Sequence, residues 1–121
     1  KLPRGLPRLQ AIFDNWLAWA RPGRLPGGCV FLAAAVELDD QPGTLRDHLV
    51  NLQRDWVETL ARSVRLAQEE GHLPVATDPH QLAFEIYGIM MSYHLYTRLL
   101  RDSAAEARAR AGFARALKAA T

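Results

Sequence analysis

The stretch DPHQLAFEIYGIMMSYHLYTRLLR, residues 78–101, decides the fold of this chain. It opens with an Asp that can cap a helix, a Pro suited to the first helical turn and a Gln three residues after the Asp. The apolar residues that follow keep helical spacing to about Arg101, so the stretch predicts one long helix. These residues fall on two opposite faces, one made of Leu82, Ile86, Ile89, Tyr93, Tyr96 and Leu100, the other of Phe84, Gly88, Met91 and Leu95.

Two opposed apolar faces predict that this helix is buried on both sides. A helix on the surface of a monomer needs only one apolar stripe. The final segment of the chain repeats the pattern, with a smooth face of alanines that is rimmed by Arg108, Arg115 and Lys118. Helix propensity in a solvated tail is the alternative explanation for these alanines.

Subunit association explains both segments together. Two helices from each of two subunits would form a four-helix bundle about a two-fold axis. The expected partner is therefore a second copy of the chain. The candidate interface residues are Phe84, Tyr87, Gly88, Met91, Leu95, Ala107, Ala111 and Ala114.

Helical periodicity also runs through the rest of the chain, whereas strand alternation and hairpin turns are nearly absent. The sequence therefore predicts an all-α fold of five helices, over about residues 7–20, 29–38, 45–70, 78–101 and 104–119. The segment 29–38 has an ambiguous period that also fits a buried strand, but three consecutive alanines favour a helix.

Several helix ends carry recognisable signals. Thr44 with Asp47, and Ser103 with Glu106, resemble capping boxes at the starts of the third and fifth helices. Gly71 is placed to end the third helix in a left-handed conformation.

The bulk composition excludes several classes of protein. The 121 residues fit one domain, and a net charge of +2 is too small to indicate nucleic-acid binding by itself. A single cysteine and the absence of a signal peptide favour a reducing cytoplasm. Glu85, His94 and Arg98 interrupt the most apolar segment, so no membrane span is expected. Because the chain begins with Lys1, we expect it to be a fragment of a longer protein.

The sequence shows no arrangement of catalytic or metal-binding residues. Cys29 could act as a nucleophile with His48 or His94 as its base, but nothing brings them together, and a packing role is more common. The carboxylates of Glu37, Asp39 and Asp40 could hold a cation, although solvation of a turn explains them as well. The four histidines lack zinc-site spacing. We therefore expect no enzyme activity, no metal and no cofactor.

Aromatic residues suggest a binding cavity instead. Phe13, Trp16, Phe31 and Trp56 are placed to converge among the first three helices, and large rings of this kind line small-molecule cavities. An ordinary aromatic core is the alternative. His48 lies on the flank of the third helix's apolar stripe, where a rim histidine or a ligand contact would both fit.

Two runs of residues resemble a known family. Gly27-Gly28-Cys29-Val30-Phe31, Ala33, Glu37-Leu38-Asp39, Pro42-Gly43 and Arg46-Asp47 are similar to a motif of TetR/AcrR-type transcriptional regulators, in their C-terminal domain. The later run Glu70–Leu73, Asp78-Pro79, Gln81–Glu85 and Tyr87-Gly88 is similar to a second motif of that domain. The resemblance as a whole covers about residues 6–117.

The resemblance implies that residues 1–121 form an all-α effector-binding and dimerisation domain of a regulator, expected to be a repressor. In such proteins an N-terminal helix-turn-helix domain binds operator DNA, and no such segment is present in this chain. The implied partners are a second copy of the chain and a small, apolar or aromatic effector. The effector-site candidates are Phe13, Trp16, Leu17, Cys29, Leu32, Val36, His48, Leu52 and Trp56. A helical scaffold without a ligand, or a helical enzyme using Cys29, are the alternatives.

Overall fold

The computed structural model describes residues 5–20 and 43–121, and the described residues are helical without strands. The helices are α1 (Leu6–Trp19), α3 (Thr44–Glu69), α4 (Pro79–Arg98) and α5 (Ala105–Ala120). The all-α prediction is therefore confirmed for this part of the chain. The helix predicted over residues 29–38 lies outside the described residues.

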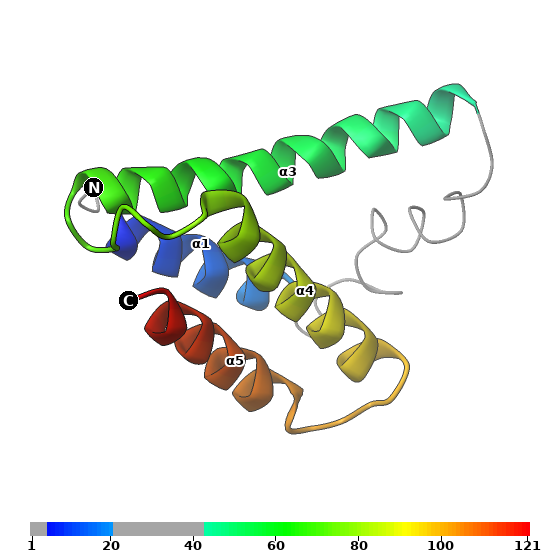
Figure 1. The fold of residues 1–121 in the computed structure, drawn as a ribbon. Coiled ribbons are helices and arrows are strands. Elements are labelled where there is room, and N and C mark those ends of the chain that lie inside the picture. The colour runs from blue at the N-terminus through cyan, green and yellow to red at the C-terminus, as the bar shows by residue number, and fades with distance from the viewer. Residues whose placement is uncertain (1–4, 21–42) are drawn as a thin grey trace.

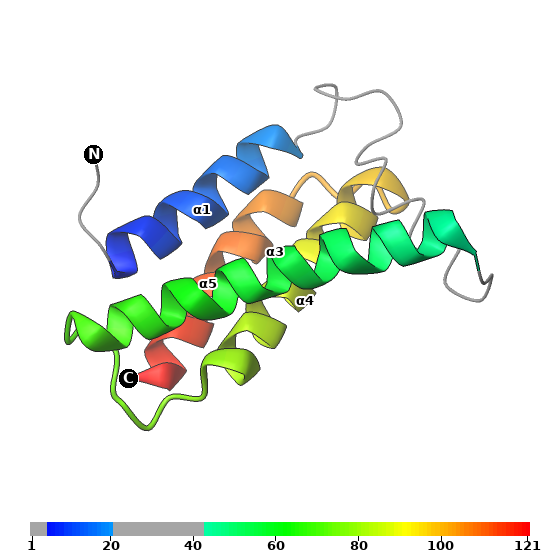
Figure 2. The same ribbon diagram turned by 90° about the horizontal axis from the view of Figure 1, so that it is seen from above.

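The long helix α3 is the spine of the fold (Figure 1). α4 packs against α3 on one side and against α5 on the other, and α1 packs against α3. α4 and α5 run antiparallel, and α5 ends near the end of α3 at which α1 begins (Figures 1 and 2). α3 and α4 diverge toward the start of α3 (Figure 1).

One hydrophobic core joins all four helices. α1 contributes Leu9, Phe13 and Leu17, which are fully buried at the helical spacing expected of a single apolar stripe. The ring of Phe13 stacks on Phe113 of α5 with centroids 4.1 Å apart and planes 5° from parallel. Burying a side chain of this size contributes roughly 1.5–3 kcal/mol. The core therefore holds α1 on the bundle by packing.

The predicted signals between α3 and α4 are confirmed. Asp78 accepts hydrogen bonds from the backbone N–H groups of His80 and Gln81, at 3.0 and 3.3 Å, and caps α4. Gly71 ends α3 with a φ of +79°. The His72 N–H bonds the Ala67 carbonyl at 2.8 Å and the Gly71 N–H bonds the Gln68 carbonyl at 3.0 Å, which is a Schellman motif.

Both predicted capping boxes are wrong. Thr44 is the first residue of α3. The N-cap residue is Gly43, and no side chain caps this helix start. Gly43 adopts a φ of +147°, a backbone conformation that favours glycine and sets the start of the helix. At α5 the Asp102 carboxylate, not Ser103, accepts the Ala104 N–H at 2.9 Å. The N-cap residue of α5 is Ala104, and no side chain caps this helix start.

α4 also ends earlier than predicted, at Arg98 and not at about Arg101. Arg101 takes a positive φ of 52°, and the following Asp102 N–H bonds the Tyr96 carbonyl at 2.9 Å. This turn reverses the chain into α5. Leu100 consequently does not continue the helix face predicted for it with Leu82 and Ile86, and it is exposed.

The start of α1 is attached to the turn between α3 and α4. The Leu6 N–H donates to Nδ1 of His72 at 3.1 Å, which satisfies one of the free backbone donors at a helix start. Gly5, the residue before, is buried and has a φ of +94°. A Cβ on Gly5 would lie 2.7 Å from His72 Nδ1 and 3.3 Å from the backbone of Ala67.

We expect Gly5→Ala to destabilise the fold because of this close approach. A strained backbone costs about 1–3 kcal/mol, and forcing His72 aside adds an overpacking cost of similar size. Gly43→Ala is the matched control, since Gly43 also has a positive φ but a Cβ there would meet nothing within 4 Å. Urea unfolding of both variants should show the larger loss for Gly5→Ala. Equal losses would contradict the role of the His72 contact.

Candidate functional site

α4 presents an apolar face that no described helix covers. Phe84 is 71% exposed and Leu95 is 51% exposed, and Gly88 lies exposed between them. These three residues are separated by whole helical turns, so they lie on the same side of the helix. The second apolar face expected from the sequence is therefore present on the surface of the single chain.

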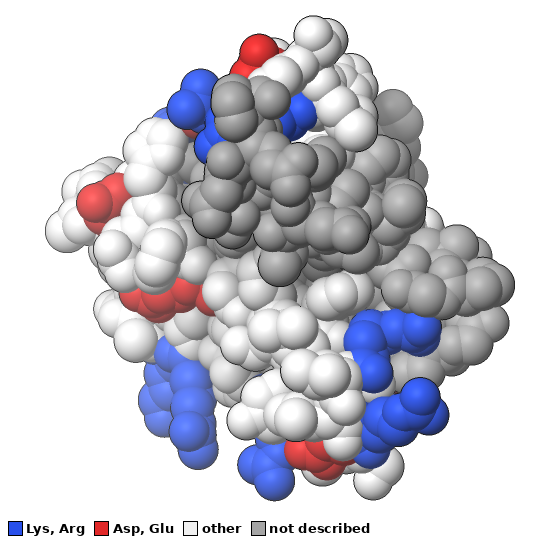
Figure 3. Space-filling view, turned by 90° about the vertical axis from the view of Figure 1, so that its right-hand side faces the viewer, with Lys and Arg blue, Asp and Glu red and all other residues white. Residues whose placement is uncertain are grey.

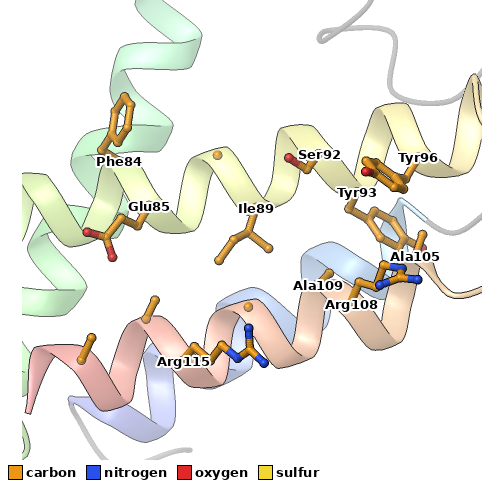
Figure 4. Close-up of a pocket in the computed structure, with 14 residues that line it drawn as sticks. Phe84, Glu85, Ile89, Ser92, Tyr93, Tyr96, Ala105, Arg108, Ala109 and Arg115 are labelled. Carbon is orange, nitrogen blue, oxygen red and sulfur yellow. The ribbon is translucent and has the colours of Figure 1, made fainter.

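A groove runs between this face and α5 (Figure 4). It encloses about 730 Å³ and is lined mainly by apolar atoms. Ile89 crosses its floor and packs toward Gly112, where a Cβ would meet the Ile89 side chain at 3.4 Å. A Cβ at position 112 would therefore be in ordinary van der Waals contact with Ile89, so α4 and α5 pack side by side here. Phe84 and Tyr96 lie toward opposite ends of the groove on the α4 side (Figure 4).

The interface candidates separate into two groups in the structure. Phe84, Gly88 and Leu95 are exposed, as are the α5 alanines Ala107, Ala111 and Ala114. Tyr87 and Met91 are half-buried and pack against the core of their own chain. The exposed apolar face of α4 is consequently narrower than the face predicted from the sequence. Tyr87 and Met91 lie at its edge.

The effector candidates also separate. Phe13 and Leu17 are fully buried in the core, and Trp16 is half-buried with its ring edge-on to Tyr93 at 5.8 Å. Trp56 is half-buried against the core and His48 is exposed. Cys29, Leu32 and Val36, together with Phe31 and the acidic Glu37, Asp39 and Asp40, lie outside the described residues.

The first half of α3 carries apolar side chains that the described helices leave uncovered. Leu45 is 61% exposed and Leu52 is 36% exposed, whereas Leu49 between them is buried. From Leu60 onward the inner positions of α3 are fully buried. The change coincides with the divergence of α3 from α4 (Figure 1).

Two polar groups on the α3 side of α4 have surroundings that the sequence did not predict. The Tyr87 hydroxyl donates to Oε1 of Gln53 on α3 at 2.5 Å. His94 lies two turns further along α4, close to the same side of the helix. Partial burial, and then the positive charge of Arg98, lower the pKa of His94. The helical spacing of Tyr87 and His94 was visible in the sequence, but Gln53 as a partner was not.

Electrostatics of the described residues are mixed. On the part of the face in Figure 3 that belongs to described residues, small basic groups lie beside acidic ones, without one continuous basic surface of the kind that contacts phosphate backbones. Within residues 5–20 and 43–121, His, Cys, Asp and Glu side chains form no group of three or more that could hold a metal ion. None of the described helices is both long enough and apolar enough to span a bilayer.

Comparison with known proteins identifies one family. The sequence model described as "Tetracyclin repressor-like, C-terminal domain" matches residues 5–113, which is most of the chain. No curated protein matches the chain.

The lowered pKa of His94 predicts a pH-dependent contribution to stability. The His94 imidazole binds a proton less readily in the folded state than in the unfolded state. The free energy of unfolding therefore decreases as the pH falls below about 6.5. His94→Gln should therefore flatten the loss of unfolding free energy between about pH 7 and pH 5. The control is His80→Gln, an exposed position on the same helix. Unchanged pH dependence in His94→Gln, measured by urea unfolding, would refute this assignment.

Proposed function

The chain belongs to the family of tetracycline repressor-like C-terminal domains, and we propose that it forms the homodimeric, effector-binding part of a ligand-responsive transcriptional repressor. Its DNA-binding domain would lie upstream of Lys1, and operator DNA would be contacted only through that domain. The proposal gives the domain a binding role and no catalytic one. It places the protein in the cytoplasm, where operator DNA is found.

The exposed apolar face of α4 carries the dimer part of the proposal. Phe84 and Leu95 expose large apolar side chains beside a groove that the alanine-rich α5 completes. Monomeric proteins rarely leave contiguous apolar surface uncovered. Covering α4 and α5 with the same helices of a second copy would form a four-helix bundle. Tyr87, Met91, Ala107, Ala111 and Ala114 would lie at or near the edges of this contact.

The uncovered first half of α3 supports the effector part of the proposal. Leu52, Trp56 and His48 lie along this half of α3, and Trp16 lies on α1. A cavity with aromatic walls and few polar groups suits a small apolar or aromatic compound. Phe13 and Leu17 would support this site from the core, since both are fully buried. Cys29, Leu32 and Val36 stay candidates for the side of the site that residues 21–42 would form.

The proposed mechanism is a shift between two arrangements of the domain. An effector held against α3 would favour the arrangement that fits it and would change the position of α1. The proposed DNA-binding domain would precede α1 in the sequence, so the position of α1 would set the distance between the two DNA-binding domains of a dimer. Two recognition helices must lie about 34 Å apart to engage both half-sites of an operator.

A dimerisation module without a small ligand is the second candidate. The full burial of Phe13 and Leu17 favours it, because these two effector candidates already contact protein on all sides. The dimer would be the same in both cases. Ligand binding at α3 distinguishes them.

Charged substitutions on the α4 face should dissociate the dimer. Phe84→Glu and Leu95→Glu place carboxylates in the proposed interface, and each should weaken the dimer by about 100-fold or more. Both side chains are exposed in the single chain, so the monomer should keep its helical content. Val75→Glu, at a 90% exposed position in the loop between α3 and α4, is the control. Sedimentation velocity and circular dichroism measure both properties, and a wild-type chain that is monomeric at tens of micromolar would refute the dimer.

A matched pair of variants tests the effector site. A screen of small aromatic compounds by thermal shift should find at least one that raises the midpoint of unfolding, as expected for a ligand that binds the folded state. Leu52→Glu should weaken its binding by about tenfold or more, because a buried carboxylate facing an apolar ligand is costly. Val75→Glu should leave the affinity unchanged. A compound whose affinity is equal in both variants would argue against a site at α3.

A further inference from the structure

The charged residues that line the groove are divided between its two walls. Glu85 belongs to α4, whereas Arg108 and Arg115 belong to α5 (Figure 4). The other residues lining the groove are uncharged. The groove therefore has one acidic wall and one basic wall.

These charges are not matched across the groove within one chain. Glu85 accepts a hydrogen bond from the amide of Gln81 at 2.9 Å, on its own helix. Arg108 lies 3.6 Å from the Asp102 carboxylate. Among the residues that the structure describes, no carboxylate pairs with Arg115. A partner that covers the groove would have to meet the acid of one wall and the arginines of the other.

A second copy of the chain can cover the groove in two ways. In a two-fold dimer the axis lies in the plane of the interface, either across the helices or along them. An axis across the helices places α4 against the partner's α4 and α5 against the partner's α5. An axis along the helices places α4 of each subunit against α5 of the other.

The charges favour the axis along the helices. An axis across them brings the arginines of α5 toward the same arginines of the partner, and leaves Glu85 facing α4, which contributes no positive charge to the groove. Like charges in an interface cost free energy, and complementary charges fix its register. The axis along the helices brings the acidic wall of each subunit against the basic wall of the other.

We propose that Glu85 forms an ion pair with Arg115 of the partner subunit, twice in each dimer, and that these pairs set the register of the four-helix bundle. The inference rests on the proposed homodimer. Arg115 is favoured over Arg108 by its place along the groove. Arg115 lies nearer the end occupied by Phe84 and Glu85, whereas Arg108 lies at the far end beside Tyr96 (Figure 4). A two-fold axis along the helices keeps residues at the same level opposite one another.

The apolar surface agrees with this register. Phe84 precedes Glu85 and is largely exposed, so the same arrangement lays its ring against α5 of the partner. Ala116 directly follows Arg115 and Ala119 lies one turn beyond it, and both line the groove on α5. Their small side chains leave room for an aromatic ring beside Arg115.

A charge-reversal cycle on the 121-residue chain tests the pair. Glu85→Arg and Arg115→Glu each place like charges opposite one another at both symmetry-related positions. Each should weaken dimerisation by roughly 10- to 100-fold at low salt, and by less at high salt. The double variant Glu85→Arg/Arg115→Glu should dimerise nearly as well as the wild type. Sedimentation across a dilution series gives the dimer dissociation constants.

Mixing the two single variants shows that the pair joins two subunits. A chain with Glu85→Arg and a chain with Arg115→Glu present opposite charges to each other at both positions, so heterodimers should form at wild-type affinity. Arg54→Glu and Asp55→Arg, at exposed positions on α3, are the charge-matched controls and should leave dimerisation unchanged. Circular dichroism checks that each chain folds.

The outcomes separate this inference from the proposed function. The ion pair is supported if each single variant dimerises weakly, the double variant dimerises like the wild type, and the mixture forms heterodimers. A stable wild-type dimer that neither single variant weakens leaves the homodimer in place and overturns the pair. Single variants that dimerise weakly and form no heterodimers when they are mixed also overturn the ion pair. A wild-type chain that stays monomeric refutes the homodimer itself, and the pair with it.

Discussion

The stacking of Phe13 on Phe113 joins the first and last helices of the described fold, and the packing of α1 depends on it. The rings lie 4.1 Å apart inside a core that Leu9 and Leu17 extend in both directions along α1. Near the surface, Arg110 of α5 also pairs with Asp14 of α1 at 2.8 Å. A half-exposed ion pair of this kind contributes at most about 1 kcal/mol, so the apolar stack dominates the attachment of α1.

This attachment limits how an effector could move α1. The start of α1 is held by the hydrogen bond from Leu6 to His72, and its middle is held by the Phe13 stack. Close-packed interiors resist continuous deformation and change between discrete arrangements. Under the proposed function, α1 would therefore keep the Phe13 stack and move together with α5 relative to α3, and this movement would release His72. The release breaks few contacts, because His72 is exposed and accepts a single hydrogen bond from Leu6.

The sequence predicted those features that depend on neighbouring residues. The helices follow from apolar periodicity, and the cap at Asp78 and the stop at Gly71 are local backbone geometry. The boxes at Thr44 and Ser103 were wrong because the N-cap residues of α3 and α5 are Gly43 and Ala104, and no side chain caps either helix start. The sequence also predicted the two apolar faces of α4. It did not predict the groove or the Gln53–Tyr87 hydrogen bond, because both depend on how two helices are placed relative to each other.

α4 links the two parts of the proposed site. Its Tyr87 side contacts α3, where the effector is proposed to bind, and its Ile89 side forms the floor of the groove that a second subunit would cover. A helix with its hydrogen bonds intact moves as a rigid element, so a ligand that separates α3 from α4 would also tilt the groove. In the proposed dimer, a tilt of α4 would change the angle between the two subunits, and that angle would set the separation of the proposed DNA-binding domains. Under the proposed function, effector binding and dimer geometry are therefore coupled through one helix, and no longer pathway through the core is required.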